Sequence, residues 1–371
     1  MTGPAWMGRG PGACAALLGL LLVALPVLGL GLVPGAVLPA YAVNVAGQVM
    51  CFALLAMSVD LMWGAAGVLS LGHGLFFALG GYIAAMHLLR TAFAATHVLP
   101  DFLLFMGQPA FPAWWAFADS AMLSVAAVLA VPALVAFAFG YVSFRSRVNG
   151  VYFSIITQAL TYTAMLLMFR NDTGFGGNNG MTGFHGIAGL PAGSRGYTVL
   201  LAALSTAAVL LTLLCGRAVL ATRFGRLLTA IRDDEPRLRF LGYDTLWLKL
   251  AAWCLSASLA AVAGALYVPQ VGIINPGLLD PALSLEVAVW VAVGGRGGLL
   301  GAILGAVLIN LLKFWLAGAA PALWPFVLSL LVLGIVLALP NGLLDMRNRS
   351  RSWMAGLAAS PPGSLSRTVR R

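Results

Sequence analysis

Long apolar stretches recur from one end of the chain to the other, and this feature decides what the chain can fold into. A helix of about 20 apolar residues crosses the hydrocarbon core of a bilayer. Only 9% of the 371 residues are charged, and 61% are hydrophobic. Because a water-soluble domain carries about a quarter charged residues, a soluble fold is excluded. The sequence predicts an all-α, polytopic integral membrane protein.

The apolar stretches predict about ten transmembrane helices, because a helix satisfies its own backbone hydrogen bonds in lipid. We place them at residues 13–33, 38–63, 74–90, 119–144, 151–169, 198–215, 248–269, 284–295, 297–316 and 324–341. The closely spaced pair 284–295 and 297–316 is expected to be partly re-entrant. The first stretch also looks like a secretory signal, but we interpret it as a retained helix because the topology requires it.

Lysine and arginine are distributed unevenly among the loops. With a cytoplasmic N-terminus and alternating helices, most of the 21 basic residues fall on the inner side, seven of them between Arg217 and Lys249. The outer segments 91–118, 270–283 and 317–323 contain no lysine or arginine. By the positive-inside rule, both termini are cytoplasmic. This distribution accounts for the net charge of +10 without nucleic acid as a partner.

The domain organisation follows from the same pattern. Residues 1–342 are expected to form one transmembrane domain with a cytoplasmic loop at 216–247. Residues 343–371 form a basic tail rich in serine and proline. Such a composition predicts disorder and contact with anionic lipid headgroups.

Catalytic and metal-binding patterns are missing from the sequence. Lys249 and Lys313 each follow a leucine, so neither completes the Gly-Lys-Ser/Thr end of a phosphate-binding P-loop. The four histidines form no H-E-x-x-H pair, and the cysteines have no metal-ligand spacing. Glycine-rich "GFGGNNG" at 174–180 is interpreted as a turn. We therefore expect no cofactor, no metal site and no enzymatic activity.

The inner loop has a helical pattern of its own. Phe224, Leu227, Leu228 and Ile231 lie on one helical face. The sequence "DDEPRLRFLG" then predicts a short second helix over 236–241. Such a helix suits docking of a soluble partner or contact with headgroups, and the pattern alone leaves both open. The residues expected to form the docking site are Arg226, Arg232, Glu235, Pro236, Leu238, Leu241 and Gly242.

Three stretches carry a family resemblance through their order and spacing. They are "GVLSLGHGLFFALGGY" at 67–82, "RFGRLLTAIRDDEPRLRFLGYD" at 223–244, and the segment 267–306. Over residues 40 to 342 the chain resembles the permeases of branched-chain amino acid and urea importers of the ATP-binding cassette class. Through residues 144–161 and 170–184 it most closely resembles the second, larger permease of the urea importer.

The resemblance implies a bacterial inner-membrane location and a set of partners. These are a second related permease, two ATPase subunits, and a periplasmic or extracellular solute-binding protein. It also implies that the inner loop docks in a groove of the ATPase. Glu235 and Gly242 are the nearest equivalents of the family's Glu-Ala-Ala-x-x-x-Gly signature. Pro236 and Arg237 replace its small pair, and the spacing is one residue longer.

A polar, glycine-rich notch interrupts the first of these stretches. Gly72 and Gly74 are expected to permit close helix packing. Ser70 and His73, three residues apart, share one face if the segment is helical. Transporters place such breaks at the solute path, so both residues are candidates for it. We favour packing and gating over direct solute contact.

Two further patterns lie near the C-terminal end. Gly297, Gly301 and Gly305 repeat every four residues and predict a packing face. Glu286 has Trp290 one turn later, so it either accepts hydrogen bonds from a solute amide or locks one helix to another. Arg296 is interpreted as a cytoplasmic anchor.

The small number of charges at membrane depth bears on the solute. Asp60, Glu286 and Lys313 are the charged candidates there, whereas a zwitterionic amino acid calls for counter-charges or helix N-termini. With the resemblance, this favours urea as the solute. A branched-chain amino acid permease is one alternative. An ion-gradient-driven secondary transporter coupled through Asp60, Glu286 and His73 is another.

Overall fold

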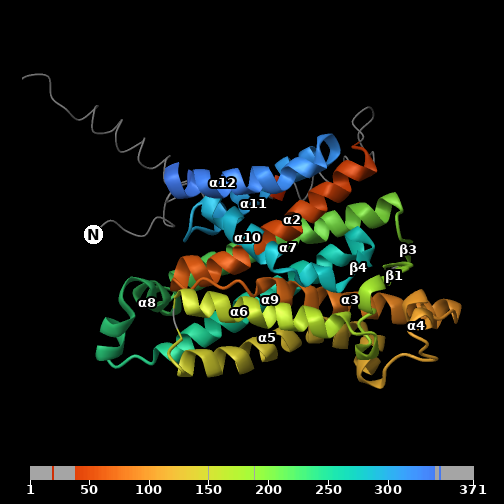
Figure 1. Ribbon diagram of the computed structural model, residues 1–371, viewed down its shortest axis with the longest axis horizontal. Helices are drawn as coiled ribbons and strands as arrows, with labels where there is room; N and C mark the ends of the chain where they lie inside the picture. The colour runs from red at the N-terminus through yellow and green to blue at the C-terminus, as the bar shows by residue number, and fades with distance from the viewer. Residues whose placement is uncertain (1–18, 21–37, 149, 188, 339–341, 344–371) are drawn as a thin grey trace, which may run out of the picture.

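The chain is described by a computed structural model that covers residues 19–20, 38–148, 150–187, 189–338 and 342–343. This part of the chain is mostly helical (Figure 1). The helices are α2 (Ala40–Asp60), α3 (His73–Thr96), α4 (Asp101–Phe105), α5 (Ala121–Arg145), α6 (Val151–Phe169), α7 (Arg195–Ala221), α8 (Arg223–Phe240), α9 (Thr245–Val271), α10 (Pro281–Gly294), α11 (Leu299–Ala319) and α12 (Trp324–Ala338).

Seven helices in the described residues are long and apolar enough to cross a membrane, which confirms a polytopic membrane protein. They are α2 with its π-helical extension Leu61–Ala65, α3, α5, α6, α7, α9 and α11. The helices α10 and α12 are apolar but shorter. The predicted helix 13–33 and the tail 343–371 lie almost wholly outside the described residues.

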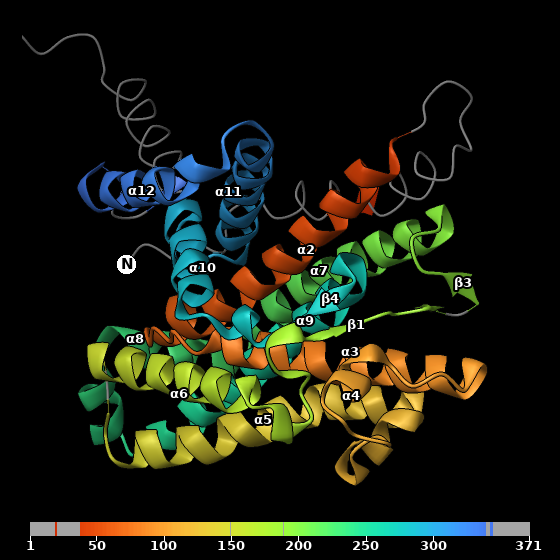
Figure 2. The same ribbon diagram turned by 45° about the vertical axis from the view of Figure 1, so that its right-hand side comes forward.

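The two ends of the helix bundle differ in what they carry. In Figures 1 and 2, α8 lies at one end of the long helices, whereas α4, β1 (Met181–Thr182) and β3 (Leu190–Pro191) lie at the other. The basic loop and the outer segments are therefore at opposite ends, as the charge distribution predicts. We call these the inner end and the outer end.

Glycines allow the central helices to touch through their backbones. A Cβ atom on Gly264 of α9 would lie 1.7 Å from the carbonyl oxygen of Phe77 in α3. Two of the three glycines predicted to form a packing face, Gly301 and Gly305, also allow close contact between backbones. A Cβ atom on Gly301 or on Gly305 would collide with the backbone of α10. Gly297 lies outside the helix, in the turn before α11 with a φ of 79°, and its backbone approaches Gly64 so closely that a Cβ atom on Gly64 would lie 2.5 Å from the amide nitrogen of Gly297.

The helix α10 starts inside the bundle and does not span it. Its 14 residues give a length of about 21 Å, less than the hydrocarbon thickness of about 30 Å. The preceding strand β4 (Ile273–Ile274) pairs with β1 at the outer end. In contrast, Ser284 in the first turn of α10 accepts a hydrogen bond of 3.2 Å from the backbone amide of Gly74 in α3. The chain therefore runs inward from β4 before α10 begins.

Candidate functional site

The glycine-rich notch is a buried, non-helical connection between α2 and α3. The helical path ends at Ala66 and resumes at His73. Side-chain hydroxyls of α6 satisfy the freed backbone groups: Thr157 accepts from the amide of Leu71 at 3.1 Å, and Ser154 donates to the carbonyl of Leu69 at 2.8 Å. Broken backbone at membrane depth survives where protein supplies such partners. The hydroxyls of α6 stabilise the notch in this way.

Ser70 and His73 would share a face only in a helical segment, and the segment before His73 is not helical. Ser70 lies in the non-helical segment, and its hydroxyl accepts a hydrogen bond from the amide of Gly72 at 3.0 Å. The Nε2 atom of His73 lies 2.6 Å from the hydroxyl of Ser256, which donates to the carbonyl of Ser58 at 2.5 Å. Because Ser256 donates its hydroxyl proton to Ser58, its oxygen accepts from His73, and the Nε2 atom of His73 is the donor. Its Nδ1 atom is then a buried acceptor without a partner among the described residues.

Glu286 ties three helices together. Its carboxylate lies 2.6 Å from the ammonium of Lys313 in α11 and accepts from the indole Nε1 of Trp324 in α12 at 3.0 Å. These contacts join α10 to α11 and α12, the arrangement expected of a helix lock. Trp290 lies elsewhere, fully buried with its ring 5.3 Å from that of Phe52.

Arg232 reaches from α8 into the membrane domain at a cluster that we call the inner junction, formed with Asp60, Gly64, Gly67 and Gly297. The guanidinium donates to the carbonyl of Gly64 at 2.8 Å, and the buried carboxylate of Asp60 accepts from the amide of Gly297 at 2.8 Å. A Cβ atom on Gly67 would lie 2.7 Å from Cγ of Arg232. Arg232 therefore connects the inner loop to the start of the notch, and its guanidinium does not point toward a docking surface.

The predicted break of the inner loop into two helices is confirmed. The backbone of α8 is non-helical at Asp234, whose side chain accepts from the amide of Arg237 at 3.1 Å and so caps the second helix. That helix ends in a Schellman motif, because Gly242 and Tyr243 donate to the carbonyls of Arg239 and Leu238. The positive φ of 85° at Gly242 suits this closure.

The second helix presents a different apolar surface from the one expected. Leu238 is only 5% exposed and packs inside the chain, so its expected place on the docking surface was wrong. Leu241 is 70% exposed, and Phe240, which was not among the expected docking residues, is 92% exposed. The sequence "LRFL" at 238–241 has more apolar residues than one buried helical face can hold. This excess was the signal that some of them are exposed. We call Phe240 and Leu241 the inner knob.

Glu235 anchors the second helix to the transmembrane helices. Its carboxylate lies 2.8 Å from the buried ammonium of Lys249 in α9 and accepts from Arg239 at 2.6 Å and Thr245 at 2.9 Å. Partial burial acts to raise the pKa of Glu235. The hydrogen bond and charge of Lys249, with the hydrogen bonds of Thr245 and Arg239, outweigh burial, so the pKa is lowered.

This lowered pKa predicts an acid-sensitive inner loop. The contribution of Glu235 to stability is complete above the ordinary glutamate pKa of about 4.3 and is lost as the pH falls through the lower folded-state value. We expect protection factors from hydrogen exchange over 235–249 to be constant near neutral pH and to fall in acid. In Glu235→Gln they should be low at every pH, and in the exposed control Asp233→Asn they should be unchanged. Full protection in Glu235→Gln at neutral pH would contradict the anchor.

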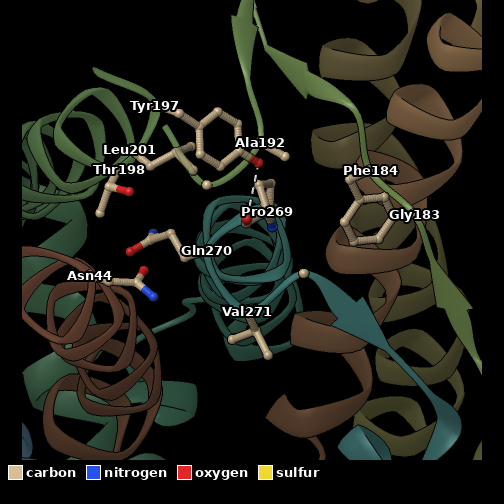
Figure 3. A pocket seen from close by; sticks show the side chains of 12 residues that line it. Asn44, Gly183, Phe184, Ala192, Tyr197, Thr198, Leu201, Pro269, Gln270 and Val271 are labelled. Carbon is tan, nitrogen blue, oxygen red and sulfur yellow. Dashed lines mark hydrogen bonds between the residues drawn. The ribbon is translucent and has the colours of Figure 1, made fainter. Parts of the chain in front are cut away.

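At the outer end, the chain encloses a pocket between α2, α7 and α9, which we call the outer pocket. Its volume is about 320 Å³. Figure 3 shows Asn44 of α2, Thr198 of α7 and Gln270 of α9 on the same side of it. Tyr197 lines another wall and donates to the carbonyl of Pro269 at 3.0 Å. None of its twelve described lining residues is charged.

Apolar spans, a buried backbone break and an anchored inner helix together define a multi-pass membrane permease. The chain belongs to the family of permease components of branched-chain amino acid transport systems, whose family model matches residues 41–340. It is a multi-pass protein of the bacterial inner membrane. Because the family consists of transport permeases, the expectation that the chain is not an enzyme is confirmed.

The similar proteins are permeases of named transport systems. The chain is 25% identical over 293 residues to the high-affinity branched-chain amino acid permease LivM of Salmonella typhimurium, covering 72% of this chain and 61% of LivM. LivM of Escherichia coli is 26% identical over 289 residues with the same coverage. BraD of Pseudomonas aeruginosa, also a branched-chain amino acid permease, is 26% identical over 70% of this chain and 80% of BraD. The chain thus spans about 61% of the length of the LivM proteins. No solved structure matches it.

Proposed function

We propose that the chain is the permease subunit of an ATP-binding cassette importer and works with separate ATPase subunits. The observation that carries the proposal is the inner knob. Phe240 and Leu241 stand exposed on a helix that is capped at both ends and anchored through Glu235. A rigid apolar projection at the inner end suits the groove of a soluble partner. By family resemblance, that partner is the ATPase.

The remaining partners follow from the same proposal. A second related permease completes the translocation path, and a solute-binding protein delivers the solute at the outer end. Within the path, we propose the notch with Ser70 and His73 as a gate, because it is a break that hydroxyls of α6 hold in place. Glu286 and Trp290 are proposed to support the path through helix packing.

We propose urea as the solute. The charged groups within the spans already have partners: Asp60 binds the amide of Gly297, Glu286 binds Lys313, and Lys249 binds Glu235. This arrangement suits a neutral solute better than a zwitterion. A branched-chain amino acid is the second candidate, favoured by the solutes named for LivM and BraD.

Uptake in cells with the complete transporter tests both the class and the solute. Deleting this subunit is expected to abolish uptake of labelled urea, and restoring it is expected to recover uptake that depends on cellular ATP. Recovery of leucine uptake with urea unaffected would replace the solute and keep the class. Uptake that a protonophore abolishes, and that persists without ATP, would instead favour an ion-gradient-driven carrier.

A further inference from the structure

We propose that the outer pocket is a binding site for a small, uncharged amide on its way from the outer surface. The proposal rests on the proposed function and extends it, because it assigns a solute site within this one subunit. The site is separate from the notch, which follows the inner end of α2.

The pocket lies where a solute arrives. Its walls are the first turns of α2 and α7 and the last turn of α9, all at the end opposite α8. The segment that contains Phe184, Ala192 and Gly193 contributes a further wall (Figure 3). A volume of about 320 Å³ accommodates a small solute together with several waters, since a water occupies about 30 Å³.

Gln270 forms a fixed, buried wall of the pocket. Only 8% of this residue is exposed. Its Nε2 atom donates to the hydroxyl of Ser205 at 2.9 Å and to the carbonyl of Leu266 at 2.7 Å, and these partners fix the orientation of the amide. Its Oε1 atom has almost no accessible surface and lies toward Gly47 of α2. Recognition of a solute in the pocket therefore falls to Asn44, whose side chain also lines it.

The packing around Gln270 is arranged to admit this side chain. A Cβ atom on Gly47 of α2 would lie 2.1 Å from Oε1 of Gln270. Any other residue at this position would therefore displace the amide. The absence of a side chain at Gly47 allows the amide to lie between α2 and α9 beside the pocket.

The lining selects for hydrogen-bonding capacity without charge. The side-chain oxygen of Asn44 accepts N–H donors, and its amide nitrogen donates to a carbonyl. Urea and acetamide carry both kinds of group. A zwitterionic amino acid would bring two charges to a lining that has no charged side chain among its described residues, and unpaired charges are costly to desolvate.

Thiol accessibility tests the site independently of transport. The complete transporter would carry Thr198→Cys, with Cys14, Cys215 and Cys254 changed to serine and the buried Cys51 retained. A membrane-impermeant thiol reagent added from the outer side is expected to label position 198. Saturating urea or acetamide should slow labelling at least threefold, and leucine should not. Exposed Asn178→Cys, in the outer loop away from the pocket, is the matched control and should be labelled equally with and without amide.

A second change tests the role of Asn44. Adding Asn44→Leu should raise the concentration of urea needed for half-maximal protection about tenfold. If Thr198→Cys does not fold, Ala192→Cys, at an exposed lining position, serves as the reporter. Absent protection by both amides, equal protection at position 178, or protection by leucine would overturn the proposal. Protection without urea uptake would keep the site and reject urea as the transported solute, whereas urea uptake without protection would reject the site alone.

Discussion

Replacing Phe240 with aspartate is expected to abolish binding of the ATPase subunits while the permease remains inserted and folded. Phe240 is almost fully exposed at the inner end, so the substitution removes no internal contact. Burying a phenylalanine in a partner contributes about 1.5–3 kcal/mol, and a carboxylate at an apolar contact adds a desolvation cost. A total of about 4 kcal/mol corresponds to a loss of affinity of about 1,000-fold. Titration of ATPase subunits onto the permease in nanodiscs measures it.

Two variants separate docking from folding. Phe240→Leu keeps an apolar side chain and is expected to bind the ATPase within a few-fold of the parent. Leu238→Asp places a charge inside the loop, because Leu238 is buried, and should lower the thermal stability and yield of the permease itself. Unchanged ATPase binding by Phe240→Asp would reject the inner knob as the docking surface.

The transmembrane helices were largely predictable because lipid imposes their length and composition. The predicted helix 151–169 matches α6 at both ends. The prediction for α3 stopped at Arg90, yet α3 continues to Thr96. Arg90 pairs with Asp119, the residue that follows the outer segment 91–118, so its charge lies where a carboxylate compensates it and the helix continues. Hydropathy does not record a partner that lies 29 residues away.

The sites were less predictable, because their geometry depends on distant residues. The glycines marked the notch correctly, but helical spacing does not describe how Ser70 lies relative to His73, since the backbone there is not helical. The partner of His73 is Ser256, 183 residues further along. For the inner helix, the pattern identified the element, but the orientation of Leu238 and Phe240 depends on the surface against which that helix packs.

Replacing Arg232 with alanine is expected to uncouple the transporter without releasing the ATPase. Its guanidinium connects α8 to the carbonyl of Gly64, in the π-helical turn that leads into the notch. We expect motion of the inner loop to reach the proposed gate through this hydrogen bond. Without it, the carbonyl of Gly64 loses its donor, and the buried carboxylate of Asp60 loses a nearby positive charge. We expect at least a tenfold loss of uptake, on the basis of one lost charged hydrogen bond of about 1.5–3 kcal/mol.

The comparison of two measurements makes this expectation specific. Arg232→Ala should retain ATPase binding in the nanodisc titration, whereas Phe240→Asp should lose it. The control is Arg223→Ala, at an exposed position at the start of α8. This variant should retain both ATPase binding and uptake. Arg232→Lys keeps the charge but lacks the forked guanidinium, so it should recover only part of the uptake. Normal uptake in Arg232→Ala, or loss of ATPase binding together with uptake, would show that the inner junction does not transmit the motion. The first outcome would make Arg232 dispensable, and the second would place it in the docking surface that its contacts with Gly64 and Gly67 argue against.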